Sequence, residues 1–135
     1  MQDVLMMKLI NCLKPVAHWP IRLTISMTYF VHGIGKLPHP AIIDNFGISP
    51  VFAYFIAFCE LLIPFLLIIG GITSIRLFNI EDFLTRLGGL LIISTMIGAI
   101  IVVHNSAWDY RHEGMEFQVL ILSCGLYFLL RGNKV

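Results

Sequence analysis

The chain has 135 residues, of which 58% are hydrophobic and only 13% are charged, and its formal net charge is +1. Soluble domains carry about 25% charged residues, so this composition argues against a soluble globular protein and against a disordered chain. The balanced charge offers no basic face for a polyanion, so we expect no nucleic-acid partner. The length suits one domain, and we expect residues 1–135 to form a single domain embedded in the lipid bilayer.

The chain begins with an amphipathic segment, for which we predict a helix over about residues 3–14 that lies in the membrane interface. Lys8, Asn11 and Lys14 recur every three residues, whereas the apolar side chains take other faces. Pro15 follows and should end the helix. Because charged and polar residues interrupt the apolar run and no small-residue cleavage site follows it, we do not expect a cleaved signal peptide.

Four hydrophobic stretches follow, and they predict an all-α fold, an antiparallel four-helix transmembrane bundle. The predicted spans are about residues 19–37, 51–72, 86–104 and 115–131. The first span contains Arg22, His32 and Lys36, so a re-entrant or interfacial segment is its alternative. The last has 14 uncharged residues from Phe117 to Leu130, which reach only about 21 Å, so this helix must start earlier and draw Glu116 toward the hydrocarbon.

Basic residues set the expected orientation of these spans. With both termini on one side, that side holds seven Lys and Arg residues: Lys8, Lys14, Arg22, Arg76, Arg86, Arg131 and Lys134. The other side holds Lys36 and Arg111, so we expect both termini in the cytoplasm. Residues 75–85 mix apolar and charged groups and are expected to form a second surface segment on the cytoplasmic side.

Glu60 is the most informative ionisable residue, because it lies roughly 14 Å inside the outer edge of the second span, near the bilayer midplane. A carboxylate exposed to lipid there is costly, so Glu60 should face the bundle and either pair with a cation or hold a proton. Lys36 ends the first span on the outer side. His32 lies one turn deeper, about 6–8 Å above Glu60 in depth. His104 ends the third span on that side, and Glu116 begins the fourth.

We therefore expect a polar pocket in the outer half of the bundle, formed by five side chains from four helices: His32, Lys36, Glu60, His104 and Glu116. Four of these residues have a simpler interpretation. Lys36 can reach the headgroups, and His104 and Glu116 can interact with helix dipoles. Glu60 can form a purely structural ion pair.

The first span also carries a polar stripe with 4-3-4-3 spacing, which places its members on one helical face, toward the bundle. The stripe consists of Arg22, Ser26, Tyr29, Gly33 and Lys36. Its innermost member, Arg22, is expected to stand alone on the inner side.

No metal site or covalently bound cofactor is expected. The three cysteines, Cys12, Cys59 and Cys124, are odd in number and lack CxxC spacing, which argues against disulfides and zinc. A b-type haem held by His32 and His104 is geometrically conceivable, but the histidine spacings match no common metal signature. The sequence also lacks a Gly-rich phosphate loop and a nucleophile motif.

The order of these residues resembles the DoxX family over roughly residues 20–132. The resemblance rests on Arg22 and Gly33-x-x-Lys36, on Gly47 to Pro50 followed by Glu60 and Gly70-Gly71, and on Arg86, Ala99, His104 and Glu116. It implies a four-helix, multi-pass protein of the bacterial inner membrane. Relatives in that family include the membrane part of thiosulfate:quinone oxidoreductases and members linked to oxidative-stress complexes.

Combined with the pocket, the resemblance suggests a quinone-linked oxidoreductase subunit. Glu60, His32 and Glu116 are the candidate catalytic residues, and Lys36, His104 and Arg22 are the candidate substrate-binding residues. Quinone is the expected ligand, and the electrons would come from another protein subunit or a small reductant. The alternative is a non-catalytic structural or accessory subunit of a larger membrane complex, so whether the chain is an enzyme stays open. A small carrier or proton conductor is a third interpretation, although no continuous polar path is evident.

Overall fold

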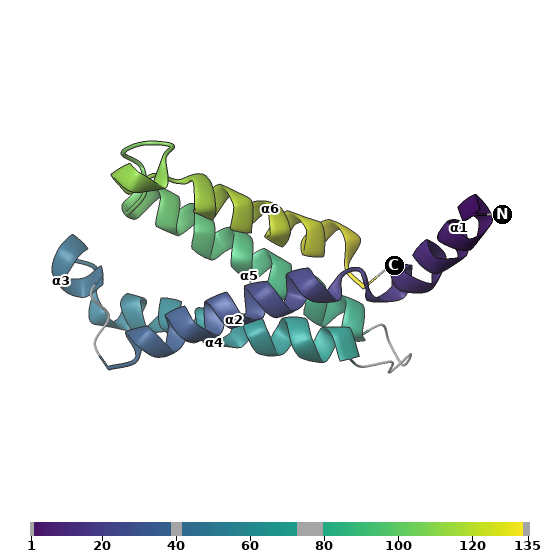
Figure 1. The fold of residues 1–135 in the computed structure, drawn as a ribbon. Helices are drawn as coiled ribbons and strands as arrows, with labels where there is room; N and C mark the ends of the chain where they lie inside the picture. The colour runs from purple at the N-terminus through teal and green to yellow at the C-terminus, as the bar shows by residue number, and fades with distance from the viewer. Residues whose placement is uncertain (1, 39–41, 73–79, 134–135) are drawn as a thin grey trace.

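A computed structural model of the chain describes residues 2–38, 42–72 and 80–133 (Figure 1). The described part consists of helices joined by turns and short loops and contains no strand, so the all-α class is confirmed. The elements are α1 (Gln2–Leu13), η1 (Lys14–Val16), α2 (Trp19–Lys36), α3 (Ile42–Phe46), α4 (Pro50–Ile72), α5 (Ile80–Val102), η2 (Tyr110–His112) and α6 (Glu116–Arg131).

Local sequence signals account for several of the helix ends. Pro20 lies in the first turn of α2, where its missing N–H is not needed, and Pro38 follows the end of this helix. α6 ends at Arg131 and is followed by Gly132, which has φ +62° and donates its N–H to the carbonyl of Phe128 at 2.9 Å. Such a backbone conformation suits glycine and terminates a helix.

The start of α5 differs from the prediction. The third span was expected to begin near residue 86, after a surface segment, but the helix begins at Ile80, so residues 80–85 are its first turns. Residues 75–79 lie outside the described part. Two of the charges that suggested a surface segment, Glu81 and Asp82, lie in the first turn of α5. Acidic side chains there are favoured by the helix dipole. Asp82 also pairs with Arg86 one turn later, with Nε to Oδ2 at 2.6 Å.

Each long helix packs against the next one along the chain, in the order α2, α4, α5 and α6. Their shared core is apolar apart from one hydroxyl group and consists of Ile25, Tyr29, Ile63, Leu67, Ile92 and Phe128. α5 and α6 approach closely at Gly89 and Gly125, where a Cβ on Gly89 would lie 2.7 Å from the Gly125 carbonyl oxygen. Small residues allow this close approach, which is common between membrane helices.

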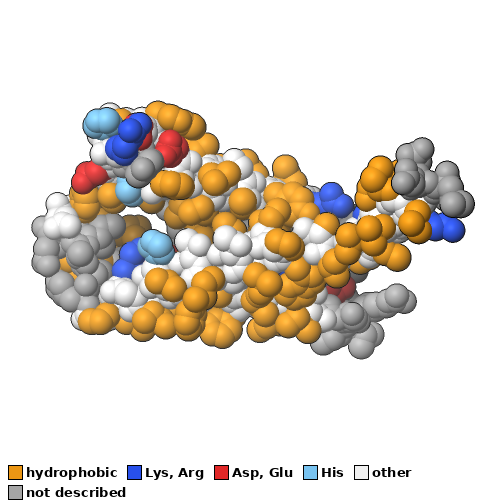
Figure 2. All heavy atoms as spheres, viewed as in Figure 1, with side chains coloured by type: hydrophobic (Ala, Val, Ile, Leu, Met, Phe, Trp, Pro, Cys, Tyr) orange, Lys and Arg blue, Asp and Glu red, His pale blue; other side chains and the backbone are white. Residues whose placement is uncertain are grey.

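The helices converge at one end of the molecule and diverge at the other (Figure 1). They converge where α2 begins, and there the guanidinium of Arg22 lies 5.0 Å from the ring centroid of Phe128 on α6. Toward the end of α2 at Lys36, the α5–α6 hairpin separates from α2 and α4. The surface is hollowed between them, with basic and histidine side chains on both rims (Figure 2). α1 projects away from the converging end, and its described side chains are all exposed.

Two of the described helices, α4 and α5, are long and apolar enough to cross a membrane. Each has 23 residues, which gives about 35 Å of helix for a hydrocarbon core of about 30 Å. Large apolar side chains on their outer faces are exposed, including Phe55 at 58% and Phe58 at 59%. α2 and α6 are shorter, with 18 and 16 residues.

Candidate functional site

The centre of the candidate site is an ion pair between two of the expected residues. Lys36, in the last turn of α2, contacts Oε1 of Glu60, which lies in the middle of α4. The Glu60 side chain is only 7% exposed, whereas that of Lys36 is 30% exposed. The second carboxylate oxygen of Glu60, Oε2, is buried and has no hydrogen-bond partner among the described residues. The site therefore combines a desolvated carboxylate, one cation and one unused acceptor.

The polar stripe of α2 faces the bundle, as predicted. Arg22, Ser26, Tyr29 and Gly33 are all buried. The Tyr29 hydroxyl shares a 2.9 Å hydrogen bond with Thr95 Oγ1 of α5, whereas Ser26 Oγ is buried without a partner. The stripe thus places hydroxyl groups between the ion pair and the converging end of the helices.

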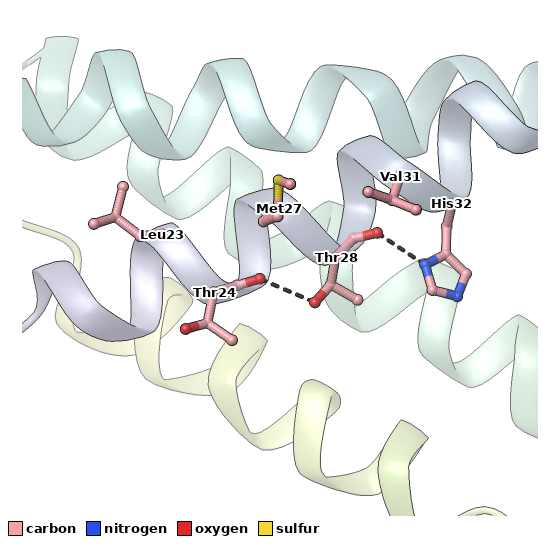
Figure 3. A pocket seen from close by; sticks show the side chains of 6 residues that line it. All are labelled: Leu23, Thr24, Met27, Thr28, Val31 and His32. Carbon is pink, nitrogen blue, oxygen red and sulfur yellow. Dashed lines mark hydrogen bonds between the residues drawn. The ribbon is translucent and has the colours of Figure 1, made fainter.

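His32 lies on a different face of α2 from this stripe and is exposed. Its Nδ1 donates to the carbonyl of Thr28 at 2.8 Å, which leaves Nε2 free to act as an acceptor when the ring is neutral. The ring stands at one end of a shallow groove of about 550 Å³ (Figure 3). The groove is lined by Leu23, Thr24, Met27, Thr28, Val31 and His32.

His104 and Glu116 belong to the α5–α6 hairpin, and the contacts seen for them lie within it. His104 Nδ1 donates to the carbonyl of Glu113 at 3.2 Å, which ties the end of α5 to the following loop. Glu116 is the first residue of α6, and its amide donates to the Trp108 carbonyl at 3.1 Å. A carboxylate in this first turn is favoured by the helix dipole. Neither residue is seen in contact with Glu60.

Arg22 is at the opposite end of the bundle, and it does not stand alone as expected. It is fully buried at 0% exposure, and Nη1 donates to the Leu67 carbonyl at 2.6 Å and to Thr85 Oγ1 at 3.2 Å. Nη2 donates to Asn133 Oδ1 at 2.5 Å. These partners come from α4, α5 and the segment after α6, so Arg22 joins all four long helices at their converging end.

A second layer of contacts supports Asn133. Its side-chain amide donates to the Gly70 carbonyl at 2.5 Å, and its backbone N–H donates to Asp82 Oδ1 at 2.8 Å. Sequence reasoning missed this residue, because it lies 111 positions from Arg22 and no local pattern links the two. The arrangement stabilises the fold and uses two of the arginine nitrogens in bonds to protein.

His18 lies beside this cluster, just before α2, and its Nε2 is buried without a partner. Burial lowers the pKa of His18, and the positive charges of Arg22 and Arg131 lower it further. This end of the molecule is therefore electrostatically unfavourable for an additional proton.

Of the six candidate residues, the structure brings Lys36 and Glu60 into contact. It places Arg22 at the other end of the bundle, His32 on an exposed face of α2, and His104 and Glu116 together on the α5–α6 hairpin, where their partners are local. Among the described residues, no three His, Cys, Asp or Glu side chains are grouped so that they could hold a metal ion. The chemistry that this arrangement supports is proton exchange and hydrogen bonding at a buried, lysine-paired carboxylate.

Comparison with known proteins identifies one family. The model of the family described as DoxX matches residues 18–105, more than half of the chain, and confirms the resemblance seen in the sequence. The match includes α2, α4 and α5 and ends before α6. No curated protein and no solved structure matches the chain.

Proposed function

The chain belongs to the DoxX family of membrane proteins, and from this premise we propose that it is a quinone-linked oxidoreductase subunit whose site is centred on Glu60. The observation that carries the proposal is the buried Glu60 carboxylate, paired with Lys36 and left with one free oxygen. Reduction of a quinone consumes two electrons and two protons, so a site for it needs a group that holds and transfers protons. No cofactor motif occurs in the chain, and the electrons would come from a partner subunit or a small reductant.

Several features of the site suit a quinone headgroup. Lys36 is partly exposed at the hollowed end of the bundle, where its ammonium group could hydrogen-bond a quinone oxygen. Glu60, in its protonated form, would donate through the oxygen that now has no partner. The groove that ends at His32 offers an apolar surface of α2 for an isoprenoid tail (Figure 3). In this proposal His104 and Glu116 line the opposite rim.

The proposal includes a four-helix transmembrane arrangement in the bacterial inner membrane, with both termini in the cytoplasm and α1 in the interface. It is supported by the two long apolar helices and by the bias of basic residues toward one side. The charges of α2 are compatible with a span, because Arg22 is hydrogen-bonded inside the bundle and Lys36 is paired with Glu60. Pairing of this kind reduces the cost of charge in the hydrocarbon.

The decisive test compares the Glu60→Gln variant with the wild type in lipid nanodiscs. A photoreactive azidoquinone should crosslink to the wild type near Lys36, and quinol formation from a short-tailed quinone should be measurable with a dithiol or thiosulfate as donor. We expect Glu60→Gln to fall about 100-fold in quinol formation, the usual size of a lost acid–base group. Glu113→Gln, the same change at an exposed loop position, is the matched control and should keep full activity. Equal turnover by a folded Glu60→Gln protein would disprove the proposal.

A second candidate function is a non-catalytic subunit of a larger membrane complex. One observation favours it: α1 projects from the bundle with its apolar residues exposed, including Leu5 at 71% and Leu9 at 61%. Such a helix suits docking to another component. A protein that copurifies with partners, crosslinks no quinone and forms no quinol would support this function over the first.

A further inference from the structure

Among the described residues, the polar contact that links Glu60 to the protein surface is its ion pair with Lys36. Lys36 lies in the last turn of α2 and is 30% exposed. α2 ends there, where the helices diverge and the surface is hollowed (Figures 1 and 2). A proton can therefore reach the carboxylate by a short route, through water around the lysine headgroup. The free Oε2 atom offers a place for it to bind.

In the opposite direction an apolar layer separates Glu60 from the converging end. Ile63, Leu67, Ile92 and Phe128 are each 0% exposed and belong to one packed cluster. Leu67 lies seven positions after Glu60 in α4, which corresponds to about 10 Å along the helix. Among the residues that the structure describes, the hydroxyl groups of this region do not form a continuous chain, because Tyr29 is bonded to Thr95 and Ser26 has no partner.

A fixed positive charge lies beyond the apolar layer. Arg22 is fully buried there and is held by Leu67, Thr85 and Asn133. A buried arginine is an electrostatic barrier to protons in membrane pores. In the described part of the chain, the layer and the arginine both lie between Glu60 and the converging end.

The ionisable groups around Glu60 do not provide another route. Lys36 and Tyr29 on α2 and Cys59 on α4 are its ionisable neighbours in the described residues. His104 and Glu116 stand at the ends of α5 and α6, on the hairpin that forms the other rim of the hollow. Lys36, His104 and Glu116 are thus on the same side of the apolar layer.

We infer that Glu60 exchanges protons with one side of the membrane only, the side on which α2 ends at Lys36. The inference deepens the proposed function, because a quinone reduced at this site would take its protons from that side. It rests on the same carboxylate as the proposed function, but a test of it needs no quinone.

The test measures the protonation of Glu60 while the pH is changed on one side at a time. The full chain is reconstituted in sealed vesicles, and its orientation is determined by labelling the exposed Cys12 thiol with an impermeant maleimide. Dicyclohexylcarbodiimide enters from the lipid and reacts with protonated carboxyl groups, and peptide mass spectrometry gives its rate of addition to Glu60. Glu60→Gln removes the labelled site and verifies the assignment.

We expect the rate at Glu60 to rise several-fold when the pH on the Lys36 side falls from about 8 to about 6, because only protonated carboxyl groups react and the protonated fraction of any carboxyl group grows as the pH falls. The same change on the other side should leave the rate unaltered. Glu81, in the first turn of α5 at the converging end, is the internal control and should follow the pH of that other side. A rate at Glu60 that follows the other side, follows both sides equally, or is zero throughout would overturn the inference. Failure of quinone binding with one-sided labelling intact would instead count only against the proposed function.

Discussion

The contact between α5 and α6 yields a prediction in which one substitution has opposite effects at two positions of one helix. A Cβ added at Gly89 would lie 2.6 Å from the Leu129 nitrogen and 2.7 Å from the Gly125 carbonyl oxygen. Both atoms belong to the backbone of α6, so no side chain can rotate away, and the two helices must separate. Gly98 lies two and a half turns further along α5, where a Cβ would meet no atom within 4 Å.

The expected energies follow from these contacts. Alanine is favoured over glycine inside a helix by about 0.8–1.0 kcal/mol, and this gain is available at both positions. At Gly89 it is opposed by overpacking, which costs about 1–3 kcal/mol and more where the backbone is the obstacle. Gly89→Ala should therefore lower the free energy of unfolding by about 1–2 kcal/mol, whereas Gly98→Ala should leave it unchanged or raise it by up to about 1 kcal/mol.

Equilibrium unfolding in mixed dodecylmaltoside and SDS micelles, followed by circular dichroism, measures the difference directly. The midpoint of Gly89→Ala should fall below that of the wild type, and the midpoint of Gly98→Ala should equal or exceed it. If the two variants unfold at the same SDS fraction, close approach of α5 and α6 at Gly89 is not a feature of the folded protein, and the reasoning fails.

Three further predictions concern the ends of the molecule. Arg22→Met should destabilise the bundle by several kcal/mol, since each buried acceptor left without its donor costs about 1–3 kcal/mol; wild-type resistance to SDS would contradict this. The fold lowers the pKa of His18 below its unfolded value of 6.5. The contribution of His18 to stability is therefore fully present above pH 6.5 and is lost as the pH falls from 6.5 through the lowered pKa. His18→Gln should therefore lose less stability than the wild type between about pH 7.5 and pH 5.5, and parallel losses would refute the assignment. An impermeant maleimide should label the exposed Cys12 in inverted membrane vesicles but not in spheroplasts, while the buried Cys59 reacts only after unfolding; labelling in spheroplasts would reverse the proposed topology.

The helices themselves are encoded locally and could be predicted. Apolar runs bounded by proline and glycine indicated the positions of α2, α4 and α6 within one or two residues. The start of α5 could not be located in this way, because the charges of Glu81 and Asp82 indicated a surface segment over residues 75–85, with the span beginning at Arg86. In the fold, Asp82 and Arg86 pair along the helix, and Thr85 is buried against Arg22.

Both members of the ion pair were expected in the same polar pocket, because the helical repeat places them on inward-facing surfaces. Lys36 was placed at the outer edge and Glu60 roughly 14 Å deeper, so residue number alone did not establish their contact, which the structure shows. The expectation of a five-membered pocket assumed that four helices stay parallel along their whole length. The observed divergence of the α5–α6 hairpin instead leaves His104 and Glu116 with partners in their own hairpin.

The amino-acid sequence by itself determined the composition suited to lipid, the inward stripe of α2 and the burial of Glu60, since these depend on the helical repeat and on the cost of charge in hydrocarbon. Only the tertiary structure decided which helices touch, where they separate and what surrounds Arg22. Those properties depend on contacts between residues far apart in the chain, such as Arg22 with Asn133 and Gly89 with Gly125. A helical repeat specifies the face and depth of each side chain but not the angle at which two helices meet.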